Sequence, residues 1–595
     1  MSDWTPDFGQ LDRPAPTWNA KRPVRIALLG DFSAGAARGR LDRGDDLAKR
    51  KPIAVEFDSL DDAIARLDVQ LTLPLGAEGA PVEMRFADLE AFHPDALYRD
   101  VAVFSSLATL RKELGNAATF AKAAAKVQGW AGGGKVKRAS RVSRRSRSRG
   151  GALAADRKLD DFSRLVGRPA TVVEAAPIDV LLRNVMAPFV VPAKDPKKDA
   201  LVASVDQALS DAMRALLHHA EFQNLEALWR GVDLLLRRLE TGPSLQVFLI
   251  DMSAEEFAAD LSSADDLGDS ALYKLLVDNP AKEKNGGFTL VCGLYRFEAT
   301  PPHAELLGRI AKIAANADAG FVTSMAADAF ADAKRGVHPL VSSTWQALRA
   351  LPEAARLAVV APSFMLRHPY GKRSDPISSF AFEEFSNADG LRSLLYGHPA
   401  LLVACVLGTP GGAKNPVVGE LPFHYFVDKD GDQIALPCTD RLLNVDAAAA
   451  LARAGLIAVQ ARKGQDDVRL AGINAVNGTP LALPGQVAPA TARGMMKTQV
   501  ALSSTLVGKA PKEAPAGDDG SGDDSSSSDS SDSFDLGSSD DSSSSDLDSL
   551  LAGMESSDDA SSDTASDDTS TDTSSDATSD AEVDPELAAL LKSLE

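Results

Sequence analysis

The chain has 595 residues, three cysteines and a formal net charge of −21, which excludes a disulfide-rich scaffold and a zinc module built on closely paired cysteines. The charge is concentrated at one end, because residues 517–595 hold 24 acidic residues and one basic residue, a local charge of −23 that leaves about +2 for the first 516 residues. A Ser/Asp-rich sequence buries too little apolar area to offset the chain entropy lost on folding. Residues 506–583 are therefore expected to form a disordered tail.

The N-terminus and the apolar runs argue against a secreted protein and against a membrane-spanning protein. The first ten residues lack a basic start followed by an apolar stretch, so no secretory signal is expected. The longest apolar runs, such as residues 399–407, fall short of the roughly 20 residues that a membrane-spanning helix needs. We expect a soluble protein of a reducing compartment, without membrane insertion.

The first foldable region covers residues 21–115 and follows a polar segment, residues 1–20, that is expected to be a flexible arm. Alternating apolar and polar residues indicate strands, and apolar residues that recur every three or four positions indicate helices. The alternating run at 23–29 ends in Gly30-Asp31, which is typical of a strand and a turn. Further strands are expected at 52–57 and 82–86, and helices around Leu60, Ile64 and Leu67 and through Leu107, Leu110 and Leu114.

Residues 116–175 are expected to form a linker with helical and basic Ser/Arg-rich parts. Residues 131–150 contain eight basic residues and no acidic one, and like charges at this density disfavour a packed helix. The tract is interpreted as a flexible linker or as a partner of the chain's own acidic tail. The alternative is nucleic-acid binding, which would not be sequence-specific because the tract has no aromatic residue for base stacking.

A second foldable region covers residues 176–505. Ser253 and Glu256 have the spacing of a capping box that begins a helix, and Asp430-Gly431 between two β-rich runs is a strong hairpin signal. A long helix is expected at 201–239, and strands at 245–250, 288–294, 356–360, 423–427 and 433–436. Strands that alternate with helices favour a mixed sheet covered by helices. The chain is therefore predicted to be an α/β protein with two modules joined by the basic linker.

The spacing of Asp428, Asp430 and Asp432 invites a calcium interpretation. A calcium-binding loop of the EF-hand type needs Gly at its sixth position and Glu at its twelfth. Counted from Asp428, Gly431 stands at the fourth position and Thr439 at the twelfth. The hairpin turn is therefore the favoured interpretation.

Other candidate sites do not meet the requirements of their chemistry. His218 and His219 are adjacent, so on a helix they point about 100° apart and cannot ligate one metal together. Residues 30–33 follow a strand and residues 408–414 are rich in glycine, but neither has the spacing of a phosphate-binding loop. The sequence also lacks the motifs of serine hydrolases and zinc proteases. We predict no catalytic residues, cofactor or metal.

The last twelve residues, 584–595, return to an amphipathic pattern. Asp584 suits a helix N-cap and Pro585 suits the first helical position. A single apolar stripe follows at i, i+3, i+4 and i+7, formed by Leu587, Leu590, Leu591 and Leu594. Twelve residues are too short to hold a helix alone in water, so the stripe is expected to bind in a partner's groove. The alternative is a frayed end with incidental leucines.

Ordered motifs in the first region point to a known family. The strand at 23–29 leads into Gly30-Asp31-Phe32-Ser33, residues 51–53 follow, and the series closes on Phe92-His93-Pro94-Asp95. In this order the region resembles the small subunit of the bacterial type VI secretion contractile sheath.

The second region resembles the large subunit of the same sheath. Its motifs include His218-His219, then Trp229-Arg230-Gly231, and later Pro369-Tyr370-Gly371, with further matching runs at 286–288, 316–321, 380–384, 396–400 and 454–456. The large-subunit family continues beyond the point where this chain becomes acidic. The resemblance thus implies a small subunit fused to a truncated large subunit.

This resemblance implies mechanical work and not catalysis. Family members interlock into a helical tube around an inner tube, and the tube contracts and is then disassembled by a hexameric ATPase, so energy is stored at assembly. The implied partners are other sheath subunits or further copies of this chain, with inner-tube, baseplate and disassembly ATPase proteins, in the bacterial cytoplasm and without specific nucleic acid. The alternative is a non-polymerising sheath paralogue, an adaptor that recruits partners through the acidic tail and the terminal helix.

Overall fold

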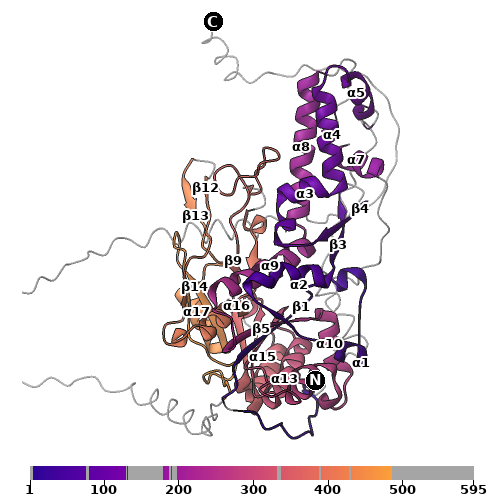
Figure 1. The fold of residues 1–595 in the computed structure, drawn as a ribbon. Coiled ribbons are helices and arrows are strands. Elements are labelled where there is room, and N and C mark those ends of the chain that lie inside the picture. Colours follow the sequence, from indigo (N-terminus) through magenta and orange to yellow (C-terminus); the bar gives the residue numbers. More distant parts are fainter. Residues whose placement is uncertain are drawn as a thin grey trace, which may run out of the picture. The chain divides into compact units, whose positions relative to one another are not determined.

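The computed structural model describes residues 5–19, 21–75, 80–128, 130, 178–186, 189–190, 197–331, 337–386, 390–427 and 431–484. The basic tract, the acidic tail and the terminal stripe of Leu587, Leu590, Leu591 and Leu594 lie outside these ranges. The described part combines helices with strands (Figure 1), which confirms the predicted α/β class.

A nine-stranded sheet forms the centre of the described part, in the order β11-β15-β14-β8-β7-β6-β1-β5-β2. The six inner strands, from β14 to β5, pair in parallel, and the outer pairs are antiparallel. The strands are β1 (Val24–Gly30), β2 (Ile53–Val55), β5 (Leu245–Asp251), β6 (Leu290–Phe297), β7 (Gly320–Met325), β8 (Leu357–Ala361), β11 (Val417–Val418), β14 (Leu456–Ala461) and β15 (Val468–Leu470). The strands predicted near 23–29, 52–57, 245–250, 288–294 and 356–360 are confirmed.

Strand β1 connects the first region to the second. It pairs in parallel with β5 over its whole length, from Val24 opposite Leu245 to Gly30 opposite Asp251, and its other edge pairs with β6. Its side chains alternate between the two core clusters on opposite faces of the sheet. A parallel strand covered on both faces needs a nearly continuous apolar run, which the sequence VRIALLG provides. The two regions therefore share one sheet.

Helices cover both faces of this sheet. One core cluster includes residues of α2 (Leu60–Leu67), α4 (Ala102–Gly115), α8 (Lys198–Leu217), α9 (Ala220–Arg238) and α16 (Ala400–Gly408). The other includes residues of α10 (Ala254–Ser263), α13 (Pro301–Asn316), α15 (Pro339–Ala350) and α17 (Val445–Ala454). The remaining α-helices of the described part are α1 (Asp45–Ala48), α3 (Pro94–Asp100), α5 (Phe120–Gln128), α7 (Ile178–Met186), α11 (Ala271–Tyr273), α12 (Asn279–Ala281) and α14 (Asp328–Ala331).

The single helix predicted at 201–239 is wrong, because the chain forms two helices there. His218 follows the end of α8, and His219 caps α9 by accepting a hydrogen bond from the backbone N–H of Glu221 at 3.3 Å. The apolar spacing continues across the break, so periodicity alone could not reveal it. The capping box predicted for α10 is confirmed, since Ser253 and Glu256 exchange side-chain-to-backbone hydrogen bonds of 3.1 and 2.9 Å.

Within the described ranges, three two-stranded sheets accompany the main sheet. β3 (Val69–Leu75) pairs with β4 (Ala80–Phe86), β9 (Phe364–Met365) with β10 (Tyr396–Gly397), and β12 (Tyr425–Val427) with β13 (Gln433–Ala435). The last pair is antiparallel as predicted for the hairpin, whose tip at 428–430 lies outside the described residues. Helix α4 runs beside α8 (Figure 1), and Arg111 pairs there with Asp206.

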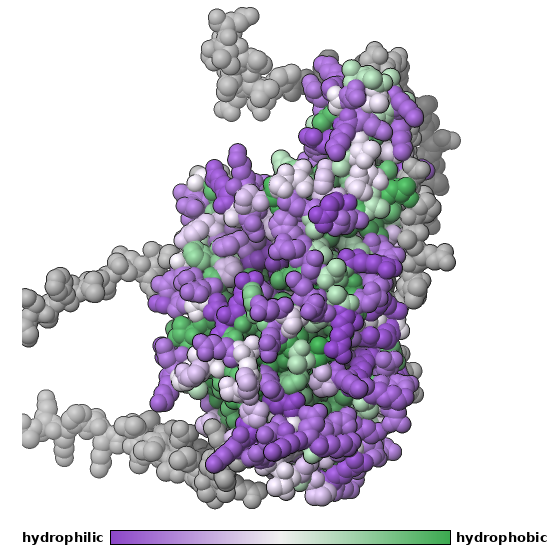
Figure 2. All heavy atoms as spheres, in the orientation of Figure 1, coloured by the Kyte–Doolittle hydropathy of each residue, from purple (hydrophilic) through white to green (hydrophobic). Residues whose placement is uncertain are grey.

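The face of the molecule in Figure 2 carries mostly hydrophilic residues with smaller hydrophobic patches between them. This agrees with the location of most large apolar side chains in the two core clusters. Among the helices of the described ranges, none combines the length with the apolar character that crossing a bilayer requires.

Candidate functional site

The motif residues of the two regions meet along one contact surface, which we call the seam: the contact of residues 21–128 with residues 197–484. At the carboxyl end of β1, the buried ring of Phe32 lies edge-on to the buried indole of Trp229, with ring centroids 5.4 Å apart. The indole Nε1–H of Trp229 donates a hydrogen bond of 3.0 Å to the carbonyl oxygen of Phe32. Packing and a buried polar contact therefore coincide at this point of the seam.

Ser33 continues the seam through the carboxylate of Asp251, which ends β5. The backbone N–H and the hydroxyl of Ser33 donate to Asp251 at 3.0 and 2.8 Å. The guanidinium of Arg40 donates to both Ser33 and Asp251. Strands β1 and β5 pair in parallel, with Gly30 opposite Asp251. This register places Ser33, which follows Gly30 in the turn, near the carboxylate of Asp251. The arrangement holds the turn after β1 against the end of β5.

Asp31 points into the turn after β1. Its carboxylate accepts hydrogen bonds from the backbone N–H groups of Gly35 and Ala36 at 2.6 and 3.0 Å. Burial, and then the nearby charge of Asp251, raise the pKa of Asp31 to about 7 and outweigh the two backbone hydrogen bonds. The charge at this end of the seam therefore changes near neutral pH.

The motif Phe92-His93-Pro94-Asp95 forms a second part of the seam. Phe92 stacks on Phe86, with centroids 4.1 Å apart, and both rings meet Phe222 of α9 edge-on. His93 caps α3 by accepting from the backbone N–H of Asp95 at 3.2 Å, and Pro94 occupies the first helical position, which suits its missing N–H.

His93 and Asp95 also reach the second region. The ring of His93 lies edge-on to Tyr370 at 5.0 Å. The carboxylate of Asp95 accepts hydrogen bonds of 2.8 to 3.2 Å from Ser378 and Ser379. Burial raises the pKa of Asp95, but these hydrogen bonds together outweigh it and lower the pKa to about 2. Asp95 is therefore charged at neutral pH and holds the segment that follows Tyr370.

A buried ionic network lies behind Tyr370. Arg367 forms two-pronged hydrogen bonds with Glu226 at 2.8 and 3.2 Å and with Glu384 at 2.7 and 3.0 Å. Arg230 donates to Glu226 at 2.7 Å and to the hydroxyl of Tyr370 at 2.9 Å. Burial raises the pKa of Glu226, but Arg367 and Arg230 reverse this effect and keep it below its usual value. Two carboxylates thus balance two guanidinium groups, as buried charges require.

The remaining motif residues have structural positions. A side chain at Gly231 would lie 2.5 Å from Leu401, so glycine allows α9 and α16 to approach. A side chain at Gly371 would meet the carboxylate of Glu383 at 2.3 Å, and Pro369 before it is buried. His218 and His219 separate two helices, and burial lowers the pKa of His219.

Sequence reasoning missed the residues to which these motifs bind. Asp251 stood in no motif, and Glu226, Arg367 and Glu384 were given no role of their own, although together these four residues hold both ends of the seam. Glu226 carried a signal: it is fully buried among the apolar positions of α9, where an unpaired carboxylate would be costly. Arg367 and Glu384 gave no such signal because no regular helix or strand surrounds them.

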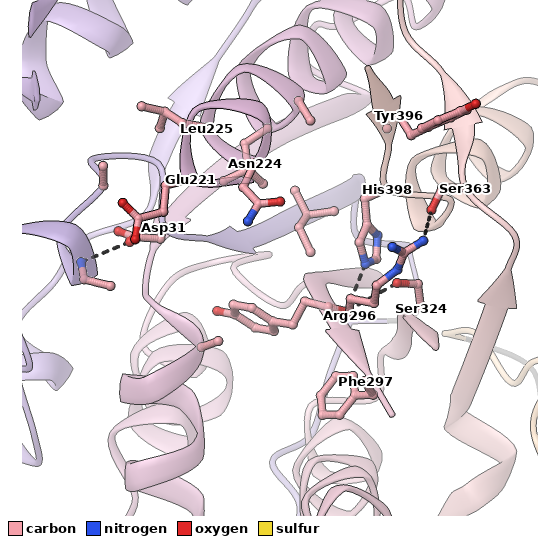
Figure 3. Close-up of a pocket in the computed structure, with 18 of the residues that line it drawn as sticks. Asp31, Glu221, Asn224, Leu225, Arg296, Phe297, Ser324, Ser363, Tyr396 and His398 are labelled. Atoms are coloured by element: carbon pink, nitrogen blue, oxygen red, sulfur yellow. Dashed lines mark hydrogen bonds between the residues drawn. The ribbon is translucent and has the colours of Figure 1, made fainter. Parts of the chain in front are cut away.

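A cavity of about 430 Å³ opens beside the seam, at the carboxyl ends of β1, β6 and β7. In Figure 3, Asp31 and Glu221 lie on one side of it, and Arg296, Ser363, Tyr396 and His398 lie on the other, with Asn224 between them. The carboxyl ends of parallel strands are the usual place for ligands in sheets of this kind.

Several polar groups of this cavity, among them His398 and Arg296, are hydrogen-bonded within the protein, whereas the buried hydroxyl of Tyr396 has no hydrogen-bond partner among the described residues. Both ring nitrogens of His398 face backbone groups, the carbonyl oxygen of Tyr295 at 3.0 Å and the N–H of Ala400 at 3.4 Å. Burial lowers the pKa of His398 to about 4, so the ring is neutral at pH 7. Arg296 donates to Ser363 and Asp440, both at 2.7 Å. Since His398 has no ring nitrogen left for a hydroxyl, the cavity lacks a serine–histidine pair among the described residues.

The described residues bring together no group of three or more His, Cys, Asp or Glu side chains that could hold a metal ion. Of the three aspartates of the predicted hairpin, the structure describes Asp432, because residues 428–430 lie outside the described ranges. The glycine-rich run at 408–414 forms the end of α16 and a short 3-10 turn, with Gly411 in the left-handed region at φ 74°.

Two family models match this chain, one on each side of the seam. Residues 18–128 match the family described as "Type VI secretion system, VipA, VC_A0107 or Hcp2". Residues 199–477 match "EvpB/VC_A0108, tail sheath N-terminal domain".

A curated relative agrees with the second match. The chain is 26% identical over 297 residues to the type VI secretion system sheath protein TssC1 of Pseudomonas aeruginosa. The alignment covers 45% of this chain and spans 59% of the length of that relative.

The seam falls between the two matched segments, since Phe32 and Asp95 lie in the first and Trp229 and Tyr370 lie in the second. The resemblance noted in the sequence is confirmed for both segments. The chain therefore carries, in one polypeptide, a small-subunit segment (residues 18–128) and a large-subunit segment (residues 199–477) that match the sheath proteins of type VI secretion.

Proposed function

We propose that this chain is a structural subunit of a type VI secretion-like contractile sheath that packs around an inner tube. The observation that carries the proposal is the position of β1, a strand of the small-subunit segment, between β5 and β6 of the large-subunit segment. A strand paired on both edges cannot leave without breaking two ladders of backbone hydrogen bonds. The two segments therefore act as one building block of the tube.

Fusion of the two segments supports the same role. A tether turns the association of two subunits into an intramolecular contact with an effective concentration in the millimolar range. Each large-subunit segment is then made together with one small-subunit segment, so the two segments are always present in a ratio of one to one. We propose further copies of this chain or other sheath subunits as its partners, with inner-tube, baseplate and disassembly ATPase proteins, in the bacterial cytoplasm.

The role is proposed to be mechanical, without catalysis. Contraction of a tube needs an interface with two stable arrangements repeated along the filament, and energy stored at assembly can drive it. The hydrogen bonds that His398 and Arg296 make within the protein are consistent with this role.

A second candidate is a non-polymerising sheath paralogue that acts as an adaptor. The observation in its favour is the local charge of −23 in residues 517–595, which keeps the chain soluble and repels other copies. In this role the terminal leucine stripe would recruit the partner.

Negative-stain electron microscopy of the purified full-length chain separates the two candidates. The sheath proposal expects tubes, formed either by the chain alone or after its neighbouring secretion proteins are added. A seam variant, Trp229→Ala, should abolish the tubes, whereas Lys122→Ala on the exposed surface of α5 should not. A monodisperse small particle under all conditions would overturn the sheath proposal and favour the adaptor.

A further inference from the structure

Residues 5–19, within the segment predicted to be a flexible arm, lie against the large-subunit segment. They contact α13, the 3-10 turn Leu267–Asp269 and the loop before β6, a surface that we call the arm groove. Phe8, Leu11 and Trp18 pack there against the core cluster that contains α13. The matched small-subunit segment begins only at residue 18, so most of the arm lies outside both family matches.

One stripe of α13 binds the backbone of the arm. Glu305 accepts from the N–H of Asp7 at 3.1 Å, and Arg309 donates to the Asp7 carbonyl oxygen at 3.3 Å. Lys312 donates to the carbonyl oxygen of Gly9 at 2.7 Å, and Asn316 donates to that of Arg13 at 3.0 Å. These four residues recur every three or four positions, so they lie on one face of the helix. A helix face that pairs with several backbone groups of the arm is suited to hold a peptide.

Glycines form notches for the side chains of the arm. A side chain on Gly308 of α13 would lie 2.1 Å from the ring of Phe8, and one on Gly287 would lie 2.5 Å from the ring of Trp18. Trp18 is also fixed by its indole N–H, which donates to the carbonyl oxygen of Asn316 at 2.9 Å. The rings of Phe8 and Trp18 thus occupy space that any side chain in place of Gly308 and Gly287 would fill.

The groove also matches the charge of the arm. Arg13 lies over the ring of Tyr273, with its guanidinium carbon 5.6 Å from the centroid, and pairs with Asp269 and Asp278. A side chain at Gly268 would meet Arg13 at 2.6 Å. At the other end, Asp7 pairs with Arg309 at 2.7 Å.

We infer that the arm groove is a peptide-binding site and that its occupant is the chain's own N-terminal arm, bound in cis as a latch. The arm is separated from β1 by only residues 20–23, so the tether favours docking on the same molecule. The latch gives the small-subunit segment a second attachment to the large-subunit segment, independent of the seam. The inference does not depend on sheath assembly.

A disulfide in the full-length chain tests whether the arm docks in cis. Phe8→Cys combined with Gly308→Cys places two thiols where the Phe8 ring now meets α13, and the three native cysteines are buried. Mild oxidation should give a cross-linked species with the mass of one chain on a non-reducing gel. A cross-linked dimer would show that a second copy supplies the arm, and failure of the pair to cross-link would overturn docking altogether.

Peptide binding tests the groove itself. A fluorescent peptide of residues 5–19 should bind the full-length Phe8→Ala/Trp18→Ala variant at least tenfold more tightly than the unchanged chain, whose groove is filled. Adding Gly308→Leu to that variant should abolish binding, and a peptide with the same two alanines should not bind. Equal binding to the unchanged chain and the double variant, or to both peptides, would overturn the inference. A thermal melt of each variant verifies that the variant is folded. If a peptide-binding variant does not fold, the disulfide cross-link alone decides whether the arm docks in the groove.

Discussion

Trp229 of the large-subunit segment donates its indole N–H to the carbonyl oxygen of Phe32 in the small-subunit segment, across 3.0 Å. Both residues are fully buried. The contact joins the turn after β1 to the middle of α9, so it reports directly on whether the two segments are in place.

Trp229→Phe should destabilise the chain by about 1–3 kcal/mol, because the buried carbonyl group of Phe32 loses its donor. Trp345→Phe is a matched control, since the indole of Trp345 donates to Ala454 at 2.8 Å within the large-subunit segment. Both variants should lower the midpoint of urea unfolding. Only Trp229→Phe should weaken binding between separately expressed fragments that contain residues 21–115 and 176–505. Equal loss of binding in both variants would contradict the role assigned to Trp229.

Asp95→Ala should cost about 2 kcal/mol at pH 7. The pKa of Asp95 is about 2, below the usual value for aspartate, and each unit of this shift corresponds to about 1.4 kcal/mol, less the screening by solvent of this partly exposed carboxylate. A depressed pKa stabilises the fold above the unfolded pKa, and this contribution is lost only as the pH falls toward about 2.

The same change should release the segment after Tyr370, because Ser378 and Ser379 lose their acceptor. Trypsin should then cleave faster after Lys372 and Arg373. The control Asp61→Ala removes a carboxylate that accepts from Leu89 away from the seam, and it should leave this cleavage unchanged. An unchanged cleavage rate in Asp95→Ala would refute the anchoring role.

Asp31 should make stability fall as the pH rises through neutrality. Its pKa in the folded chain is about 7, above that of an unfolded aspartate, so the folded state keeps a proton that the unfolded state has released. The contribution is therefore present at low pH and is lost as the pH rises through about 7, with a slope of at most about 1.4 kcal/mol per pH unit.

Urea unfolding between about pH 4 and pH 8 measures this slope, which should end above about pH 7. Asp31→Asn should remove it, whereas Asp46→Asn, which changes an exposed carboxylate paired with Lys49, should keep it. A slope that persists in Asp31→Asn would assign the proton to another group.

Gly231→Val should destabilise the chain by about 1–3 kcal/mol through overpacking. A side chain at this position lies 2.5 Å from the buried Leu401, which has little room to move. Gly115→Val, at the end of α4 where nothing lies within 4 Å of an added side chain, is the control and should change stability little. Thermal denaturation of both variants checks the difference, and similar melting temperatures would show that α16 can adjust.

Deletion of residues 584–595 should remove one interaction partner without changing the thermal melt. The stripe of Leu587, Leu590, Leu591 and Leu594 is predicted from sequence to be too short to fold alone, so its loss removes a docking motif and no core. Affinity purification from a native extract, compared with the full-length chain, measures this. If the deletion variant keeps the same partners as the full-length chain, the tail serves only to keep the chain soluble.

The sequence by itself determined the features that depend on neighbouring residues. The capping box of Ser253 and Glu256 spans three positions, so the two residues satisfy each other's backbone regardless of the remaining fold. The strand β1 was predictable because its apolar run and the turn after it are local signals. The order of motifs such as Phe92-His93-Pro94-Asp95 indicated the family without any contact being known.

Only the tertiary structure decided what those elements bind. β1 lies between β5 and β6, more than 200 residues away, and no local pattern specifies a strand's neighbours. Strand β7 and the arm groove on α13 were likewise not predicted, and the buried partners Arg367 and Glu384 sit in irregular chain. Pairing across such distances is set by which buried faces and charges complement one another once the chain is folded. That complementarity joins residues whose separation along the sequence carries no periodic signal.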